Sequence, residues 1–136
     1  MTEDPAPQNN APLGKRKVLL VDDDERNLYA LARALKHRGA EVVVAENGQG
    51  ALDVLLEDDQ IDIVLMDIMM PEMDGYEAIK KIRAINRVSS IPIIALTANA
   101  MVGDRDKCIA AGASDYLSKP VALQSLMEKI NVWISE

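Results

Sequence analysis

Short apolar runs alternate five times along the chain with longer segments in which apolar residues recur at helical spacing. The runs cover residues 18–21, 42–45, 61–66, 91–96 and 115–118. Continuous apolar runs of this length are typical of strands that are buried on both faces of a parallel sheet. The pattern therefore predicts an α/β fold of five successive strand–helix units, with helices on both sides of one doubly wound sheet.

The helix-length segments each carry a stripe of apolar residues that should face the core. In the first and last segments these stripes consist of Leu28, Leu31, Ala32 and Leu35, and of Leu123, Leu126, Met127, Ile130 and Ile134. Gly39 and Gly112 stand where a helix should stop shortly before a strand. We expect Cys108 to be a small core residue and Trp133 to complete the core face of the last helix.

Length and charge narrow the organisation and the partners. With 136 residues and 49% hydrophobic content, the chain suits one compact domain, which we place at residues 17–136 after a disordered tail or linker at 1–16. The net charge of −7 opposes binding to nucleic acid or to anionic lipid and favours protein partners or cations. A single cysteine and the lack of an apolar run of roughly 20 residues favour a reducing, cytoplasmic location. We expect mostly a monomer and leave association on phosphorylation open.

Polar residues follow four of the five expected strands. They are Asp22, Asp23 and Asp24 after the first strand, Asp67 after the third, Thr97 after the fourth and Lys119 after the fifth. In doubly wound sheets, ligands bind outside the carboxyl ends of the strands, near the point where strand order reverses. If the strand order is 2-1-3-4-5, the first and third strands are neighbours, and the acidic cluster and Asp67 converge.

This set of side chains suits magnesium-assisted phosphoryl transfer. Gathered carboxylates need a hard divalent cation between them, and Mg²⁺, with Mn²⁺ as an alternative, is usually held by one or two carboxylates. Asp22, Asp23 and Asp67 count as −3, while Mg²⁺ and Lys119 count as +3, so a phosphoryl group meets no net negative charge. The Lys119 ammonium and the Thr97 hydroxyl would bind phosphate oxygens, and a carboxylate nucleophile would yield an aspartyl phosphate.

Two further acids are better explained by local structure. Asp24 is the third member of its cluster, and we favour a role as the cap of the following helix over a role as a metal ligand. Asp74 likewise has the position of an N-cap or turn residue.

Four segments together resemble the receiver domain of two-component response regulators. They are 18–24 (VLLVDDD), 65–75 (LMDIMMPEMDG), 93–98 (IIALTA) and 112–120 (GASDYLSKP). The likeness extends from about Lys17 to the C-terminus and is greatest to receivers attached to hybrid sensor kinases. It implies a flavodoxin-like sheet with strand order 2-1-3-4-5, and a partner that is a histidine kinase or a histidine phosphotransfer protein.

The resemblance also implies a role for each matching residue. Asp67 would be the phosphoacceptor, Asp23 and Asp67 direct Mg²⁺ ligands, Asp22 a ligand mainly through water, and Met69 a ligand through its carbonyl. Thr97 and Tyr116 would be a switch pair, and the bond between Lys119 and Pro120 would be cis. From the residues alone, Tyr116 would be a half-buried packing residue.

A flank of the first helix is a candidate docking surface for the phosphodonor. Asn27, Ala30 and Ala34 have short side chains at helical spacing, one position back from the buried stripe, so a partner helix could approach closely. Val121 should border the same mouth of the site. The alternative is that the two alanines are only good helix formers.

Two other functions use similar residues. A haloacid-dehalogenase-type phosphatase would use Asp22 as the nucleophile of an Asp-x-Asp pair with Asp24, but no acidic pair follows Lys119, and the chain leaves no room for a cap domain. A pseudo-receiver that only binds partners would keep the fold, but that class usually lacks an acid, the threonine or the lysine. All of these are present.

Overall fold

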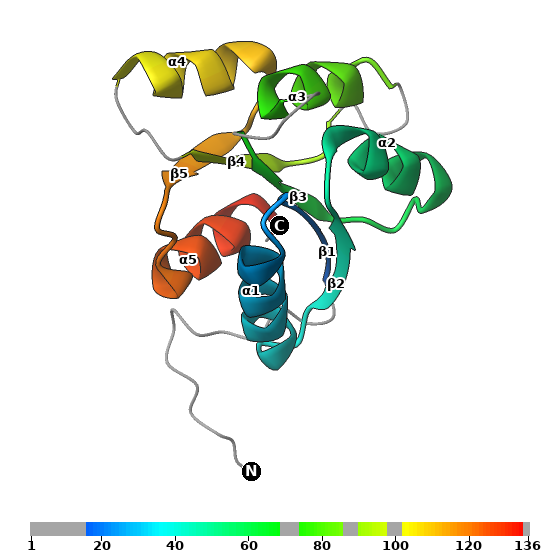
Figure 1. Ribbon diagram of the computed structural model, residues 1–136, viewed down its shortest axis with the longest axis vertical. Coiled ribbons are helices and arrows are strands. Elements are labelled where there is room, and N and C mark those ends of the chain that lie inside the picture. The colour runs from blue at the N-terminus through cyan, green and yellow to red at the C-terminus, as the bar shows by residue number, and fades with distance from the viewer. Residues whose placement is uncertain (1–15, 69–73, 86–89, 98–101, 135–136) are drawn as a thin grey trace.

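The chain folds into one parallel sheet with helices on both faces (Figure 1). The computed structural model describes residues 16–68, 74–85, 90–97 and 102–134. The strands are β1 (Lys17–Val21), β2 (Glu41–Ala45), β3 (Ile63–Asp67), β4 (Ile93–Thr97) and β5 (Asp115–Ser118). The helices are α1 (Glu25–His37), α2 (Gly48–Glu57), α3 (Gly75–Arg83), α4 (Val102–Ala111) and α5 (Leu123–Ile134).

The strand order is β2-β1-β3-β4-β5, as the resemblance implied, and every neighbouring pair is parallel, as the sequence pattern predicted. The order reverses between β1 and β3, where Val21 pairs with Met66. The next residues, Asp22 and Asp67, therefore lie side by side at the carboxyl edge of the sheet. This is the switch point at which ligands bind in such folds.

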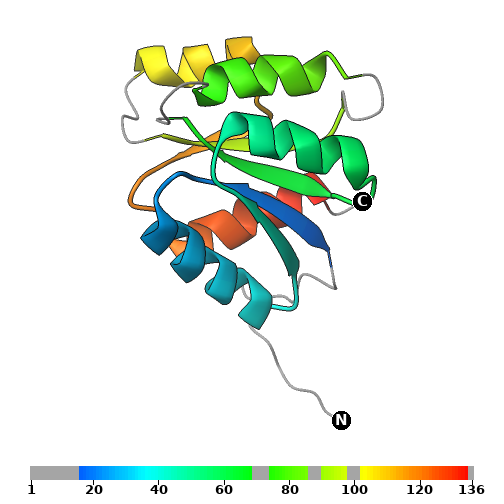
Figure 2. The same ribbon diagram turned by 45° about the vertical axis from the view of Figure 1, so that its right-hand side comes forward.

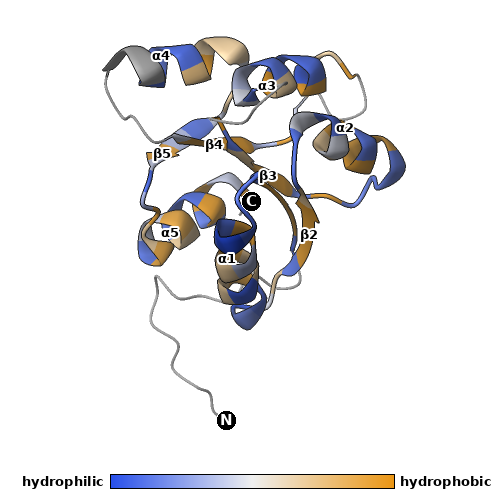
Figure 3. Cartoon of the chain, viewed as in Figure 1, coloured by the Kyte–Doolittle hydropathy of each residue, from blue (hydrophilic) through white to orange (hydrophobic). Residues whose placement is uncertain are grey.

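Two apolar layers hold the helices against the sheet. Figure 2 shows the helices on the two sides of the sheet. Helices α1 and α5 cover one face, where Leu28, Leu35 and Ile130 are buried. Helices α2, α3 and α4 cover the other, where Ile79 and Cys108 are fully buried. Hydropathy colouring shows β2 and β3 mostly apolar, whereas the helices carry both polar and apolar residues (Figure 3).

The helix boundaries follow local signals in the sequence. Asp24 and Asp74 are the N-caps of α1 and α3, accepting from the amides of Arg26 at 3.0 Å and Glu77 at 2.9 Å, which confirms their capping role. Gly39 and Gly112 follow α1 and α4 with φ of 96° and 119°. This left-handed conformation favours glycine, so both predicted helix stops are confirmed.

Three expectations about position need correction. β3 and β4 begin two residues later than predicted, because Ile61 and Ile91 are buried ahead of the hydrogen-bonded ladder. Asp67 and Thr97 are the last residues of their strands and do not follow them. The prediction that Trp133 completes the core face of α5 was wrong: Trp133 is 40% exposed, and its indole N–H donates to Asp115 at 3.1 Å.

Candidate functional site

Three carboxylates meet at the switch point of the sheet. Asp22 and Asp23 directly follow β1, Asp67 ends β3, and one oxygen of each lies within 4.8 Å of the others. Asp22 and Asp67 are each 1% exposed, whereas Asp23 faces solvent. Asp24 is absent from this cluster among the residues that the structure describes, in line with its role as a cap.

The turn after β1 fixes the orientation of Asp22. Its amide donates to the Ala45 carbonyl of β2 at 3.1 Å, and its Oδ1 accepts from the amide of Asp24 at 2.9 Å. Its Oδ2 is buried and has no hydrogen-bond partner among the described residues, although the Lys119 ammonium lies 3.5 Å away. A buried carboxylate oxygen with spare acceptor capacity, beside two further carboxylates, fits a hard divalent cation such as Mg²⁺.

Lys119 supplies the positive charge on the other side of the cluster. Its Nζ lies 3.0 Å from Asp67 Oδ1, and its side chain is 23% exposed. Burial lowers the pKa of Lys119, but the hydrogen bond and charge of Asp67, followed by those of Asp22, outweigh burial and raise the pKa above its usual value. Lys119 is therefore a stable cation at neutral pH. The Lys119–Pro120 bond is cis, as the resemblance implied.

Thr97 and Tyr116 lie on the two strands beyond β3. Thr97 ends β4 and is 2% exposed, and the strand pairing sets Asp67 opposite Leu96, one residue before Thr97. The Thr97 carbonyl accepts from the Lys119 amide at 2.7 Å, which connects β4 to the lysine loop. Tyr116 on β5 is half-buried, as its sequence context predicted, and its ring lies 5.9 Å from the Arg105 guanidinium of α4.

Gly75 packs directly behind β3. It belongs to the motif at residues 65–75, but no role was predicted for it. Its amide donates to the Ile68 carbonyl at 3.0 Å. A Cβ at this position would lie 2.5 Å from the Asp67 carbonyl oxygen and 2.6 Å from Ile68 Cα. Because real Cβ atoms do not approach backbone this closely, only glycine allows α3 to begin against β3 here.

The predicted docking residues line one groove that opens from the acidic site. Asn27, Ala30 and Ala34 of α1 face Val121 across a cavity of about 510 Å³. The lining is completed by Asp22, Lys119, Leu31, Pro120 and Leu123, so the groove reaches the Asp22 carboxylate. Met69, predicted to give a carbonyl ligand, lies outside the described residues.

A flavodoxin-like sheet with an acidic cluster, a buried threonine and a paired lysine at its carboxyl edge has the architecture of a phosphoaspartate signalling domain. The model of the response regulator receiver domain family matches residues 18–131. The chain belongs to this family, whose members are phosphoacceptor modules of two-component signalling and not classical enzymes.

Known proteins with similar sequence or structure fall in the same group. The chain is 40% identical over 127 residues to the sensor protein GacS of Pseudomonas syringae. This match covers 90% of this chain and 14% of GacS. It resembles the receiver domain of the sensor histidine kinase PA1611 of Pseudomonas aeruginosa, solved with magnesium in its active-site cleft (TM-score 0.82, 37% identity, 89% of this chain and 98% of that chain). It also resembles the receiver domain of Ssk1 of Saccharomyces cerevisiae, solved with the histidine phosphotransfer protein Ypd1 (TM-score 0.83, 32% identity, 89% and 90%).

The chain spans only part of its curated relatives, from 7% to 48% of their lengths. The match to the receiver family confirms the phosphoacceptor reading, and neither the phosphatase nor the pseudo-receiver alternative gains support. Within the described ranges, the structure has no helix that is long and apolar enough to cross a membrane.

Proposed function

We propose that Asp67 is the residue that accepts the phosphoryl group, with Asp22, Asp23 and the Met69 carbonyl completing a Mg²⁺ site. The observation that carries this assignment is the position of the Asp67 carboxylate. It ends a central strand, is 1% exposed, lies 3.0 Å from a lysine ammonium and shares a cluster with two further carboxylates. A nucleophile that is held and neutralised in this way needs no general base.

The charges of the site explain why a phosphate can approach. Asp22, Asp23 and Asp67 carry −3 and Lys119 carries +1, so the protein alone presents −2 to an anionic donor. Bound Mg²⁺, or Mn²⁺ in its place, would neutralise this charge and bind a phosphoryl oxygen. Lys119 and the Thr97 hydroxyl would bind the remaining oxygens.

The transfer itself replaces one bond with another. An Asp67 carboxylate oxygen forms a bond to phosphorus while the P–N bond to the histidine of the donor breaks. The imidazole keeps the electron pair of that bond and takes up a proton. Small acyl phosphates would serve as donors in the same way, with a carboxylate as the leaving group, and water would slowly hydrolyse the product.

The phosphorylated site would change the surface formed by α4, β5 and α5. Thr97 would move toward the new phosphoryl oxygens, and Tyr116 would turn inward behind it, as a local charge event that biases a two-state element. The half-buried position of Tyr116, beside Arg105 of α4, supports this role.

The groove between α1 and Val121 is the proposed docking site of the histidine-bearing partner, a histidine kinase or histidine phosphotransfer protein. It is lined by short and apolar side chains and leads to Asp22 and Lys119, so a helix placed there would bring its histidine near the acceptor. The domain would extend over residues 17–136 after a disordered tail or linker at 1–16, and its cytoplasmic location stays a prediction.

Phosphorylation with a small acyl phosphate and Mg²⁺, followed by mass analysis of peptides, tests the acceptor. We expect a hydroxylamine-sensitive phosphate on the peptide with Asp67, lost in Asp67→Asn and in excess chelator. Asp23→Ala should need more Mg²⁺ because it lacks a direct ligand. Label on Asp22 would instead support the phosphatase reading, and full labelling of Asp67→Asn would refute the assignment.

Arginine at Ala30 tests the docking groove separately. Ala30→Arg keeps helix propensity but fills the groove, so transfer from a phosphorylated histidine partner should fall at least about tenfold, or roughly 1.4 kcal/mol. Labelling by acyl phosphate should stay near normal. Lys36→Arg, at an exposed position of the same helix outside the groove, is the matched control. If Ala30→Arg reduces labelling equally with the histidine donor and with acyl phosphate, the acidic site itself was damaged.

A further inference from the structure

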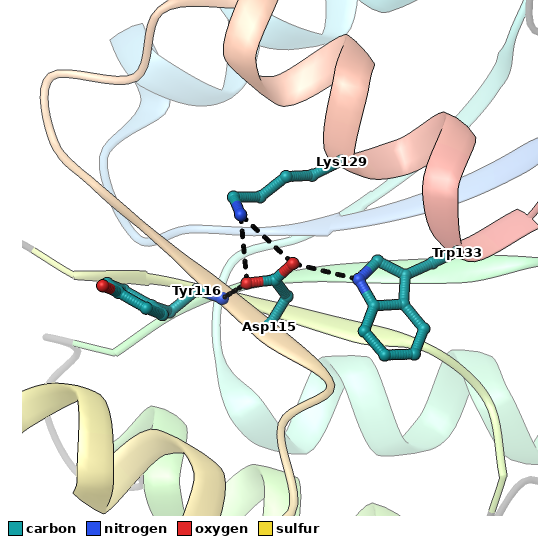
Figure 4. Close-up of polar contacts among 4 residues, drawn as sticks. All are labelled: Asp115, Tyr116, Lys129 and Trp133. Carbon is teal, nitrogen blue, oxygen red and sulfur yellow. Dashed lines mark hydrogen bonds and ion pairs between the residues drawn. The ribbon is translucent and has the colours of Figure 1, made fainter.

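The carboxylate of Asp115 accepts hydrogen bonds from two elements at once (Figure 4). From its own strand, the Tyr116 amide donates to Oδ1 at 2.8 Å. From α5, the Lys129 ammonium contacts both oxygens, at 3.1 and 3.2 Å, and the Trp133 indole N–H donates to Oδ2 at 3.1 Å. One side chain therefore joins the backbone of β5 to the last two turns of α5.

This contact is partly shielded from water. The side chains of Asp115 and Lys129 are 23% and 33% exposed. Burial acts to raise the pKa of Asp115, but the hydrogen bonds from Trp133, Tyr116 and Lys129 outweigh burial, and the pKa is lowered. The carboxylate is thus ionised at neutral pH, and hydrogen bonds to an ionised acceptor are stronger than neutral ones.

Asp115 and Tyr116 point to opposite faces of the sheet, as successive strand residues do (Figure 4). Asp115 faces α5, whereas the Tyr116 ring packs with the layer that contains α4 and lies 5.9 Å from Arg105. The peptide between the two residues also carries the amide that donates to Asp115. A reorientation of this peptide when the ring moves must stretch that hydrogen bond or shift the carboxylate.

We propose that Asp115 is a positioning residue for Tyr116, and that Lys129 and Trp133 couple the position of Tyr116 to α5. The coupling rests on the proposed function, because it takes Tyr116 as a switch residue. Through it, movement of Tyr116 on one face of the sheet changes the contacts of α5 on the other.

The resting protein tests the positioning role without phosphate. Asp115→Asn keeps the size of the side chain but removes its charge, and Trp133→Phe keeps an aromatic ring but removes the N–H donor. Hydrogen exchange of the Tyr116 amide should become about tenfold faster in Asp115→Asn and about fivefold faster in Trp133→Phe. Glu128→Gln, which removes one charge from the exposed side of the same helix, is the control and should leave this rate within about twofold. Equal rates in Asp115→Asn and the control would overturn the proposal, as would uniformly faster exchange throughout α5 without a larger effect at Tyr116.

The phosphorylated protein tests the coupling. The sequence contains one tryptophan, so the indole N–H resonance of Trp133 reports on α5 without overlap. With acyl phosphate and Mg²⁺ we expect this resonance to shift in the parent and to stay in place in Asp115→Asn, while the Thr97 amide shifts in both. A fixed indole signal in the parent, with Thr97 and Tyr116 responding, would refute the coupling and leave the proposed function intact. Absence of phosphate on Asp67 by mass would instead refute the proposed function, and the exchange rates would then decide the role of Asp115 alone.

Discussion

Replacement of Lys119 by methionine isolates the role of its charge in the acidic site. Methionine keeps most of the apolar stem but removes the ammonium that lies 3.0 Å from Asp67 and 3.5 Å from Asp22. Both carboxylates are 1% exposed, so the variant removes the nearby ammonium from two buried anions when metal is absent. Lys119→Met should therefore be less stable than the parent in chelator.

The size of the loss follows from the burial of the ion pairs. Removing one partner of a fully buried ion pair costs about 3–5 kcal/mol, because the other charge stays buried and unpaired. Lys119 is 23% exposed, so water relieves part of this cost, and we expect about 2–3 kcal/mol. For a domain of this size, that loss lowers the Tm by on the order of 10 °C.

Urea unfolding in chelator and in saturating Mg²⁺ measures this effect. A ligand that binds only the folded state raises its stability, and the variant presents −3 where the parent presents −2, so Mg²⁺ should stabilise Lys119→Met more than the parent. Lys81→Met is the matched control, because the Lys81–Glu77 pair is about half exposed, at 50% and 53%, and should change stability by less than about 1 kcal/mol. Equal stability of Lys119→Met and the parent in chelator, or equal gains from Mg²⁺, would refute the reasoning.

Three further substitutions test other parts of the structure. Gly75→Ala should cost about 2–3 kcal/mol in urea unfolding and slow phosphorylation, because the new Cβ would lie 2.5 Å from the Asp67 carbonyl oxygen. The control Gly50→Ala, whose Cβ would have 3.4 Å of clearance in α2, should be neutral or stabilising by up to about 1 kcal/mol. A Gly75→Ala variant as stable as the parent would contradict the close approach. Asp24→Ala should cost about 1 kcal/mol through loss of the α1 cap but leave the Mg²⁺ affinity from fluorescence titration unchanged, and a large loss of affinity would make Asp24 part of the metal site. Because the pKa of Asp115 is lowered in the folded state, its contribution to stability is present above the ordinary value of 3.8 and is lost as the pH falls through the folded value. The stability advantage of the parent over Asp115→Asn should thus shrink as the pH falls below the ordinary value of 3.8, and a constant advantage would show that the charge of Asp115 is not its source.

The sequence by itself determined the elements of the fold and the types of residue at the site. The apolar run at 61–66 predicted a strand, because a strand that is buried on both faces needs no polar side. Gly39 and Gly112 predicted helix ends, because glycine tolerates the left-handed conformation found at both. The capping roles of Asp24 and Asp74 were likewise local, since a cap bonds to amides only two or three residues away.

The tertiary structure decided which of these residues meet. Hydrophobic periodicity records that a strand is buried but not which strand lies beside it, so the proximity of Asp22 to Asp67 depended on the assumed order until β1 and β3 were found paired. The close approach of Gly75 to the Asp67 carbonyl and the contacts of Asp115 with Lys129 and Trp133 join residues on separate elements, and no local pattern encodes them. The prediction for Trp133 was wrong for the same reason. Helical spacing assigned Trp133 to the apolar stripe of α5, whereas its indole donates to Asp115 on β5 and stays 40% exposed.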